Sequence, residues 1–382
     1  MHILILGARA PACLEYARAF KQSQWHVTVA DSLQRPLTRY SAAIDHFLYL
    51  PAPRYKLQEW TDTLIHYIQT NKVDLVLPMC EEVFYLSYQK PLLAKYTQVL
   101  VDEFELMRVL HHKGLFAQLV ESWPIKAPET FILSDQTKLG LYKEQSEHFV
   151  FKPAFSRFAS LTLVCPKAKL LDQIRIEAFN PCIVQKFIKG TEYCSYSILH
   201  QGKVTAHSCY QPTYRAGKGA GLYFVPQNIK AILDFVMYFG RKTRFTGQVA
   251  FDFIEDETGD FFVIECNPRG SSGVHLFFNQ HQALVNALTH HSNALLTPNH
   301  QQALASKFAM VAVGLPKSLK KFRQWKIDFH MAKDIVFDPE DPKPSLNQYK
   351  STYEALCLAL KYKKSLWQAI TEDIEWNGEF LV

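Results

Sequence analysis

Hydrophobic residues in the first 80 positions fall into short runs that are separated by amphipathic stretches. The runs HILIL (2–6), HVTVADS (26–32) and VDLVLP (73–78) are rich in aliphatic and β-branched residues, which is typical of buried strands. The segments 11–20 and 57–69 lie between them and are predicted to be helices. This β-α-β-α-β alternation predicts a parallel, doubly wound α/β domain.

The hydrophobic pattern changes near residue 100. A helical segment at 103–122 leads into a β-rich stretch that is interrupted by two further helices, predicted at 167–178 and 228–243. Strands are predicted at 149–152, 161–164, 183–187, 193–200, 203–208, 247–254 and 261–266. This mixture is typical of an α+β domain rather than a parallel α/β domain.

A third part begins near residue 305. It contains the apolar runs MVAVGLP and DIVFD and one long helix predicted at 351–371. We therefore predict a doubly wound domain at 1–100, an α+β domain at 101–304 and a small C-terminal α/β extension at 305–382. Chains of this length usually divide into two or three compact domains.

Composition narrows the class of protein. An apolar fraction of 48% and a charged fraction of 20% are ordinary for a soluble protein. No apolar run reaches the roughly 18 residues of a membrane span, and eight scattered cysteines without a C-x-x-C pair favour reduced thiols. The net charge of +6 suits a small polyanionic ligand, and the basic cluster at 317–326 is best explained as a solvated helix face. We expect a cytoplasmic protein with no nucleic-acid or membrane partner; the oligomeric state stays open, a homodimer included.

Two nucleotide-binding motifs are excluded because residues that they require, glycines above all, are missing. Gly7 is the one glycine that follows the first strand, so the G-x-G-x-x-G fingerprint of nicotinamide dehydrogenases is absent. The GKG at 217–219 lacks the upstream glycine and the following Ser or Thr of a P-loop.

The stretch FFVIECNPRGSSG (261–273) carries the most specific chemistry. Glu265, Asn267 and Arg269 alternate at the end of a predicted strand, so they share one face. If the preceding turn is centred between residues 258 and 259, Asp252 lies directly across from Glu265. Two carboxylates and an amide form an oxygen ligand set that suits Mg²⁺ or Mn²⁺ together with nucleotide phosphates. Arg269 could then contact the phosphates; a merely solvated hairpin face is the alternative.

At this point the sequence resembles the ATP-grasp superfamily, most closely its carbamoyl-phosphate-synthase-like branch of carboxylate–amine ligases. The resemblance spans roughly residues 1–300 and includes PCIVQKFIKGTEYCSYS, FVFKP, HHKGLFAQLVESWPIKAPET and the P-x-x-E-E element with Glu81 and Glu82. It implies an N-terminal pre-ATP-grasp domain, a nucleotide-binding ATP-grasp domain and the cofactors ATP and Mg²⁺. The resemblance implies that Gln185, Lys186 and Ile188 contact the adenine. It further implies that Glu192 contacts the ribose and that Lys113 and Lys152 contact the phosphates.

Two loops depart from this pattern or extend it. The loop KPAFSRFASLT has no glycine, so the side chains of Ser156, Arg157 and Ser160 are expected to replace backbone donors at the phosphates. The stretch YRAGKGAGLYF (214–224) is predicted to be a mobile cationic loop in which Arg215 and Lys218 grip a substrate carboxylate or the transferring phosphoryl group; an exposed flexible loop is equally compatible.

One histidine has two interpretations. His207 lies on the strand before this loop, where it could approach the phosphates or sit satisfied in the core.

The resemblance implies an enzyme that activates a carboxylate as an acylphosphate for attack by an amine, with Arg269, Lys218 and Arg215 stabilising the transferring group. Its partners would be ATP, a small carboxylic acid and an amine. Two alternatives stay open. One is a carbamate- or bicarbonate-phosphorylating enzyme, and the other is a non-catalytic ATP-binding sensor or scaffold, which the glycine-free loop favours.

Overall fold

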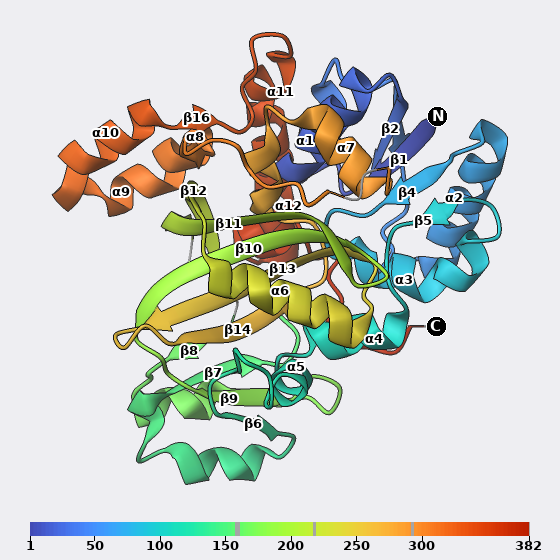
Figure 1. Ribbon diagram of the computed structural model, residues 1–382. Helices are drawn as coiled ribbons and strands as arrows, with labels where there is room; N and C mark the ends of the chain where they lie inside the picture. The colour runs from blue at the N-terminus through green and yellow to red at the C-terminus, as the bar shows by residue number, and fades with distance from the viewer. Residues whose placement is uncertain (157–160, 217–218, 292–293, 382) are drawn as a thin grey trace.

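The computed structural model describes residues 1–156, 161–216, 219–291 and 294–381, and Figure 1 shows three sheets with helices around them. The first is a five-stranded parallel sheet in the order β3-β2-β1-β4-β5. Its strands are β1 (His2–Leu6), β2 (His26–Asp31), β3 (His46–Tyr49), β4 (Leu75–Leu77) and β5 (Gln98–Val99). The predicted parallel α/β arrangement is confirmed.

Helices cover both faces of this sheet because the strands are apolar on both sides. Ile3 and Ile5 pack in one core cluster with Phe20 of α1 (Pro11–Gln22). The alternate residues Leu4 and Leu6 pack in another cluster, together with side chains of α2 (Leu57–Asn71) and α3 (Glu82–Leu93). The loops that follow β1, β2 and β4 therefore meet at one edge of the sheet.

The α+β part contains two further sheets. A four-stranded antiparallel sheet has the order β6-β9-β7-β8, with β6 (Thr130–Leu133), β7 (Phe149–Pro153), β8 (Leu163–Val164) and β9 (Cys182–Lys186). A larger sheet has the order β14-β13-β10-β11-β12-β15-β16. Its strands are β10 (Gly190–His200), β11 (Lys203–Ala216), β12 (Ala220–Gln227), β13 (Gly247–Asp256), β14 (Phe261–Asn267), β15 (Leu304–Ala305) and β16 (Lys333–Asp334). Helix α6 (Lys230–Thr243) covers one face of the large sheet (Figure 1).

Several predicted elements are wrong in extent. The helix predicted at 103–122 is two helices, α4 (Phe104–His111) and α5 (Lys113–Leu119), because His112 is extended and its ring accepts a hydrogen bond from the Leu115 N–H. The helix predicted at 167–178 is a short 3₁₀ turn, η4 (Ala168–Gln173). The helix predicted at 351–371 is α12 (Gln348–Tyr362) and α13 (Leu366–Ala369), which are separated at Lys363, a residue with a φ of 54°.

The predicted loop at 214–224 is also wrong. Strands β11 and β12 pair antiparallel as far as Arg215 with Gly221 and Ala216 with Ala220. Of the glycines that suggested a loop, Gly221 lies on β12 and packs closely against the ring of Pro212, whereas Gly217 lies outside the described residues.

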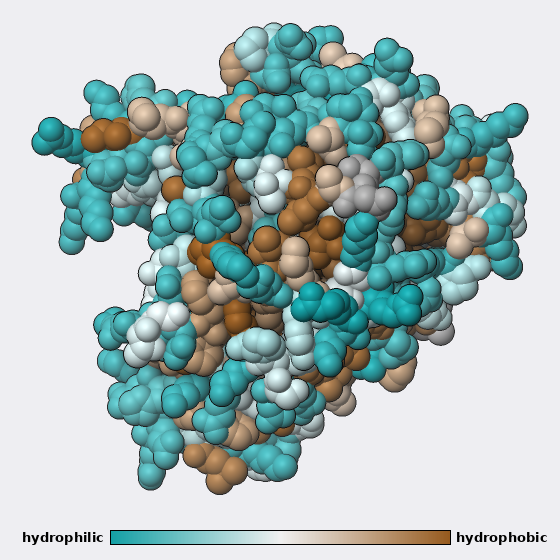
Figure 2. Space-filling view, in the orientation of Figure 1, coloured by the Kyte–Doolittle hydropathy of each residue, from teal (hydrophilic) through white to brown (hydrophobic). Residues whose placement is uncertain are grey.

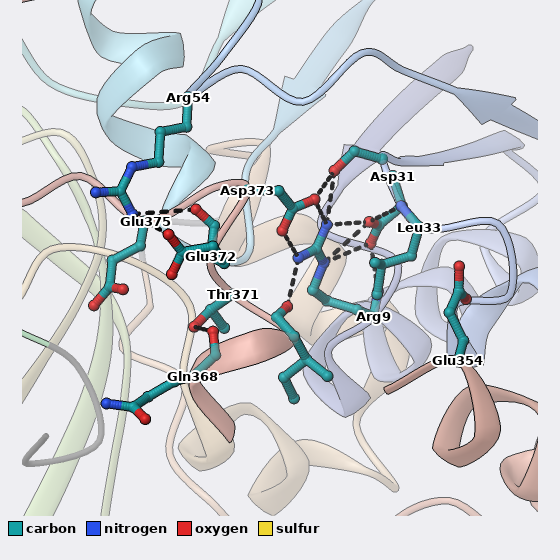
Figure 3. A network of polar contacts seen from close by, with 12 residues as sticks. Arg9, Asp31, Leu33, Arg54, Glu354, Gln368, Thr371, Glu372, Asp373 and Glu375 are labelled. Atoms are coloured by element: carbon teal, nitrogen blue, oxygen red, sulfur yellow. Dashed lines mark hydrogen bonds and ion pairs between the residues drawn. The ribbon is translucent and has the colours of Figure 1, made fainter. Parts of the chain in front are cut away.

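The C-terminal part connects two of the sheets. β15 and β16 extend the large sheet, and an arm projects from it with α8 (Lys307–Ala309), η6 (Met310–Gly314), α9 (Leu315–Lys317) and α10 (Phe322–Met331). After α11 (Lys343–Leu346), α12 and α13, the final segment returns to the parallel sheet. There Arg9, which follows β1, forms ion pairs with both Asp373 and Asp31, the last residue of β2 (Figure 3). Trp376 packs against Phe84 and Phe155.

No helix in the described ranges combines the length and apolarity needed to cross a membrane. The predicted domain limits at 100/101 and 304/305 stay predictions.

Candidate active site

The hairpin of β13 and β14 brings the predicted metal-binding residues together. Asp252 pairs with Glu265 across the two antiparallel strands, as the sequence predicted. The Nδ2 atom of Asn267 lies 3.2 Å from Oε1 of Glu265 and 3.5 Å from Oδ2 of Asp252. A β-bulge at Ile264 shifts the register between Asp252 and Phe253, and such bulges re-aim side chains beside functional sites.

The electrostatics of this cluster favour ionisation of one carboxylate over the other. Burial, and then the neighbouring charge of Glu265, raise the pKa of Asp252 well above its ordinary value. Burial opposes ionisation of Glu265 as well, but the nearby Lys113 and Lys152 ammonium groups lower its pKa. One carboxylate is therefore stable as the anion, while the second resists ionisation until more positive charge arrives.

These side chains fit a divalent cation. In this structure the Asn267 amide donates to both carboxylates, so its N–H groups occupy the position that a shared cation would take. In the part of the chain that the structure describes, no three His, Cys, Asp or Glu side chains gather into a metal site. Two carboxylates and an amide oxygen still suffice for Mg²⁺, which keeps waters and takes further ligands from phosphates.

Two lysines lie beside the carboxylates, as predicted from distant parts of the sequence. Lys113 begins α5; its side chain is 5% exposed and its Nζ lies 3.8 Å from Oε2 of Glu265. It also donates to the carbonyl of Ser156. Lys152 is on β7, where it donates to Oε1 of Gln185 at 3.0 Å. Burial lowers the pKa of Lys152 to about 8, which reflects an ammonium group poorly supplied with counter-charge.

The Arg269 side chain is held in place by Glu81 and Asn267. Its Nε donates to Oε1 of Glu81 at 2.8 Å, and its Nη2 donates to Oδ1 of Asn267 at 3.0 Å. Glu81 is 1% exposed and also lies 3.7 Å from the ring of His111. The sequence identified the P-x-x-E-E element, but nothing in its local pattern indicated that Glu81 orients Arg269. Glu82 instead accepts from the N–H groups of Met79 and Cys80 and closes the turn after β4.

The predicted adenine and ribose residues line the same cavity. Gln185 and Lys186 are the last two residues of β9, and Ile188 lies in the connection to β10. Glu192 on β10 and Arg215 on β11 form an ion pair with each other. The residue predicted for ribose and a residue predicted for substrate are therefore partners in this structure.

Three other predicted residues have different outcomes. Ser156 lines the cavity, and its buried Oγ has no hydrogen-bond partner among the described residues. Arg157 and Lys218, like Ser160, lie outside the described residues.

The prediction that His207 approaches the phosphates is wrong. His207 pairs with Ser197 of β10, whereas Asp252 pairs with Cys194 of the same strand. Positions 194 and 197 differ by an odd number, so His207 lies on the opposite face of the sheet from Asp252. Its Nδ1 atom is hydrogen-bonded to Oγ of Ser197. This face carries Phe251, which packs against Phe235 of α6.

One continuous cavity of about 810 Å³ joins these groups. It runs from the connection between β9 and β10, past the carboxylates, to the loops after β1 and β2 and to α12. Figure 2 shows the molecule hollowed between the arm with α9 and α10 and the lobe below it. The cavity volume is in the range of about 300–1,000 Å³ that is typical of small-molecule sites.

Comparison of the fold with solved structures gives the same architecture. The N5-carboxyaminoimidazole synthetase of Staphylococcus aureus is 14% identical, with a TM-score of 0.61 over 84% of this chain and 86% of that one; it has also been solved with ADP. The chain has the ATP-grasp fold. No protein-family model matches the sequence, and no curated protein does.

Two further structures share this fold. The L-amino acid ligase of Bacillus licheniformis is 15% identical, with a TM-score of 0.59 over 75% of this chain and 74% of that one. The biotin carboxylase domain of the Hydrogenobacter thermophilus 2-oxoglutarate carboxylase is 13% identical, with a TM-score of 0.58 over 75% and 69%. That domain was solved with ADP, its magnesium salt and bicarbonate. At these identities the likeness extends to the ATP-grasp fold and no further.

Proposed function

We propose that the protein is an ATP- and Mg²⁺-dependent ligase that activates a carboxylic acid as an acylphosphate for attack by an amine. The observation that carries this proposal is the paired, half-buried carboxylates of Asp252 and Glu265 beside the buried Lys113 and Lys152. Such a cluster is costly to bury without a cation, and polyphosphate is the ligand that both the carboxylate–metal set and the lysines suit.

Each residue has a defined task in this proposal. Asp252, Glu265 and Asn267 would hold Mg²⁺, which supplies charge neutralisation at the β- and γ-phosphates when bound. Lys113 and Lys152 contact phosphate oxygens, and Arg269, fixed by Glu81, contacts the γ-phosphoryl group. Gln185, Lys186 and Ile188 hold the adenine. Glu192 binds the ribose once it releases Arg215, which then faces the substrate.

The reaction follows from this placement. A carboxylate oxygen of the acid attacks the γ-phosphorus, the bond to the bridging oxygen breaks, and ADP leaves with that electron pair. The amine nitrogen then attacks the acyl carbon and expels phosphate, which keeps one oxygen of the acid, while the amine proton passes to water. Positioning and electrostatics provide the rate enhancement.

The comparisons support this proposal and one alternative. The B. licheniformis enzyme is an L-amino acid ligase, which supports carboxylate–amine ligation. Bicarbonate in the H. thermophilus complex supports bicarbonate phosphorylation as the alternative.

Oxygen-18 transfer separates these possibilities. Acids that stimulate ADP release in the presence of amines would be labelled with ¹⁸O in the carboxylate, and we expect one labelled oxygen in the released phosphate. Unlabelled phosphate during turnover would contradict the acylphosphate route. ADP release with bicarbonate alone would favour the alternative. ATP that binds without ADP release, across acids and bicarbonate, would favour a sensor.

A further inference from the structure

The polarity of the large sheet changes abruptly beside the carboxylates. Along one row of paired residues, Glu265, Asp252, Cys194 and Tyr210 follow one another on β14, β13, β10 and β11. Phe224 of β12 packs edge-on against the Tyr210 ring, at 5.4 Å between centroids. Because neighbouring strands are about 4.8 Å apart, Tyr210 begins roughly 10 Å from Asp252. A ligand that leaves the carboxylates in this direction therefore meets an aromatic floor.

Apolar side chains from the two chain ends complete this part of the cavity, which we name the apolar chamber. It is lined by Tyr210 and Phe224 from the sheet, Leu37 from the N-terminal domain, and Ile335, Ala355 and Ile370 from the C-terminal part.

One face of α12 forms a wall of the apolar chamber. Gln348, Ser351, Thr352 and Ala355 all line the cavity, and their i, i+3, i+4, i+7 spacing places them on one side of the helix.

The apolar chamber offers little charge for an anionic group. Among the described cavity-lining residues, two cations lie outside the carboxylate cluster and the connection between β9 and β10: Arg215, which is paired with Glu192, and Arg9. Its guanidinium is already paired with Asp31 and with Asp373 at 2.6 Å, and its side chain is 6% exposed (Figure 3). His275, another lining residue, is hydrogen-bonded to Glu15. A phosphate or sugar phosphate is bound most strongly by free cationic side chains, and the charged side chains here are already paired.

We propose that the apolar chamber binds the body of the carboxylic acid that is activated at Asp252 and Glu265, and that this body is an aliphatic or aryl-aliphatic chain without phosphate. The inference rests on the proposed function, since the carboxylate of the acid must reach the γ-phosphate. It also assigns a role to the C-terminal part of the chain, which supplies half of the lining side chains named above.

Binding of a homologous series tests the chamber without requiring turnover. Straight-chain acids from butyrate to decanoate, below their micelle concentrations, would be titrated calorimetrically into protein saturated with Mg²⁺ and a non-hydrolysable ATP analogue. We expect the affinity to rise about fourfold per added methylene until the chamber is full, from the transfer energy of a buried methylene. Ribose 5-phosphate and aspartate, as comparators, should bind more weakly than octanoate. Affinity that does not change with chain length, or tighter binding of a comparator, would overturn the inference.

Substitutions in α12 locate the bound chain. Ala355→Trp should abolish the rise in affinity with chain length. Ala355→Leu should make this rise stop at acids that are several carbons shorter than in the wild type. Leu360→Trp is the matched control, because Leu360 is on the same helix but 80% exposed. If the tryptophan variant does not fold, the leucine variant decides. Wild-type chain-length dependence in Ala355→Leu would contradict the location.

The two proposals fail in different ways. Acids that bind with the expected chain-length dependence but are never phosphorylated would contradict the ligase and leave the apolar ligand in place. Turnover of a phosphorylated acid, with no binding of apolar ones, would contradict the chamber assignment and leave the ligase in place.

Discussion

Lys152 is a buried cation whose proton is easily lost. Its side chain is on β7, 5% of the residue is exposed, and it donates a hydrogen bond to the neutral amide of Gln185. Burial lowers its pKa to about 8, although the charges of Glu265 and Asp252 oppose that shift. Phosphate oxygens placed beside it would stabilise the ammonium form and raise this pKa again.

ATP affinity should therefore depend on pH through Lys152. Below about pH 8 the free protein already carries the charge, so this group adds no pH dependence. Above that pH, binding must take up a proton, and the affinity should fall by up to about tenfold per pH unit. Calorimetric titration of ATP between pH 7 and 9.5, in buffers of different ionisation enthalpy, would measure both effects. Lys152→Met should bind more weakly and lose this proton uptake; unchanged uptake in the variant would contradict the assignment.

Glu15 is a second buried charge, and it links α1 to the segment after β14. Its oxygens lie 3.0 Å from Nδ1 of His275 and 2.8 Å from Nε2 of His281. Burial opposes its ionisation, but the hydrogen bonds from these histidines lower its pKa to about 2.

The Glu15 carboxylate should stabilise the protein in a defined pH window. Because its folded-state pKa lies below the ordinary 4.5, the stabilisation is fully present above that pH and is lost as the pH falls towards 2. At pH 7, Glu15→Gln should lower the free energy of unfolding by about 2 kcal/mol, the value of hydrogen bonds to a charged group. Urea unfolding at pH 7 and at about pH 2.5, near the folded-state pKa, would measure this, with the exposed Glu59→Gln as control. An equal loss at both pH values, or none, would contradict the account.

At the scale of elements, the hairpin shows why local patterns predicted the site well. The alternation of Glu265, Asn267 and Arg269 gives their common face, and the turn position gives the partner of Glu265. Near the turn, however, Phe253 pairs with Val263, one position away from a turn centred between 258 and 259. The bulge at Ile264 restores the expected pairing at Asp252. No sequence pattern indicated the bulge, because it depends on how the whole of β14 pairs with β13.

Elements defined by distant contacts were the ones that the sequence did not predict. β12 was missed because its glycines favour turns, whereas its pairing with β11 and with β15 makes it a strand. The final segment was equally unpredictable, since its partners lie far away in the sequence, 364 residues in the case of Arg9 and Asp373. Of the two interpretations of His207, the core histidine is the one that agrees with the structure, and its local sequence could not decide because it contains no information on the register between β10 and β11.

The final segment should contribute measurably to stability. Trp376 is 2% exposed and contacts Phe84, Phe104 and Phe155, which come from three different parts of the chain. Trp376→Ala should lower the free energy of unfolding by about 3–5 kcal/mol, as for other large-to-small core substitutions. Phe380→Ala, four residues later and 94% exposed, should change it by less than about 0.5 kcal/mol. Similar effects of both variants in urea unfolding would show that the segment does not dock as described.

At the scale of the whole molecule, the cavity exists because three sheets and the C-terminal part meet. Lys113, Lys152 and Glu265 come from different elements, and the fold brings them around one centre. The same assembly places an apolar chamber beside that centre. We propose that this centre is a site for ATP with a divalent cation, and that Asp252 and Glu265 are the residues on which cation binding depends.

Calorimetric binding of ATP with and without Mg²⁺ tests this claim most directly. Wild-type protein should bind ATP at least about tenfold more tightly with Mg²⁺, which corresponds to about 1.4 kcal/mol. Asp252→Asn and Glu265→Gln should lose that enhancement while remaining folded. Glu257→Gln, at the tip of the same hairpin and with a side chain 71% exposed, should keep it. Wild-type binding that is independent of Mg²⁺, or a full Mg²⁺ enhancement in either carboxylate variant, would contradict the account.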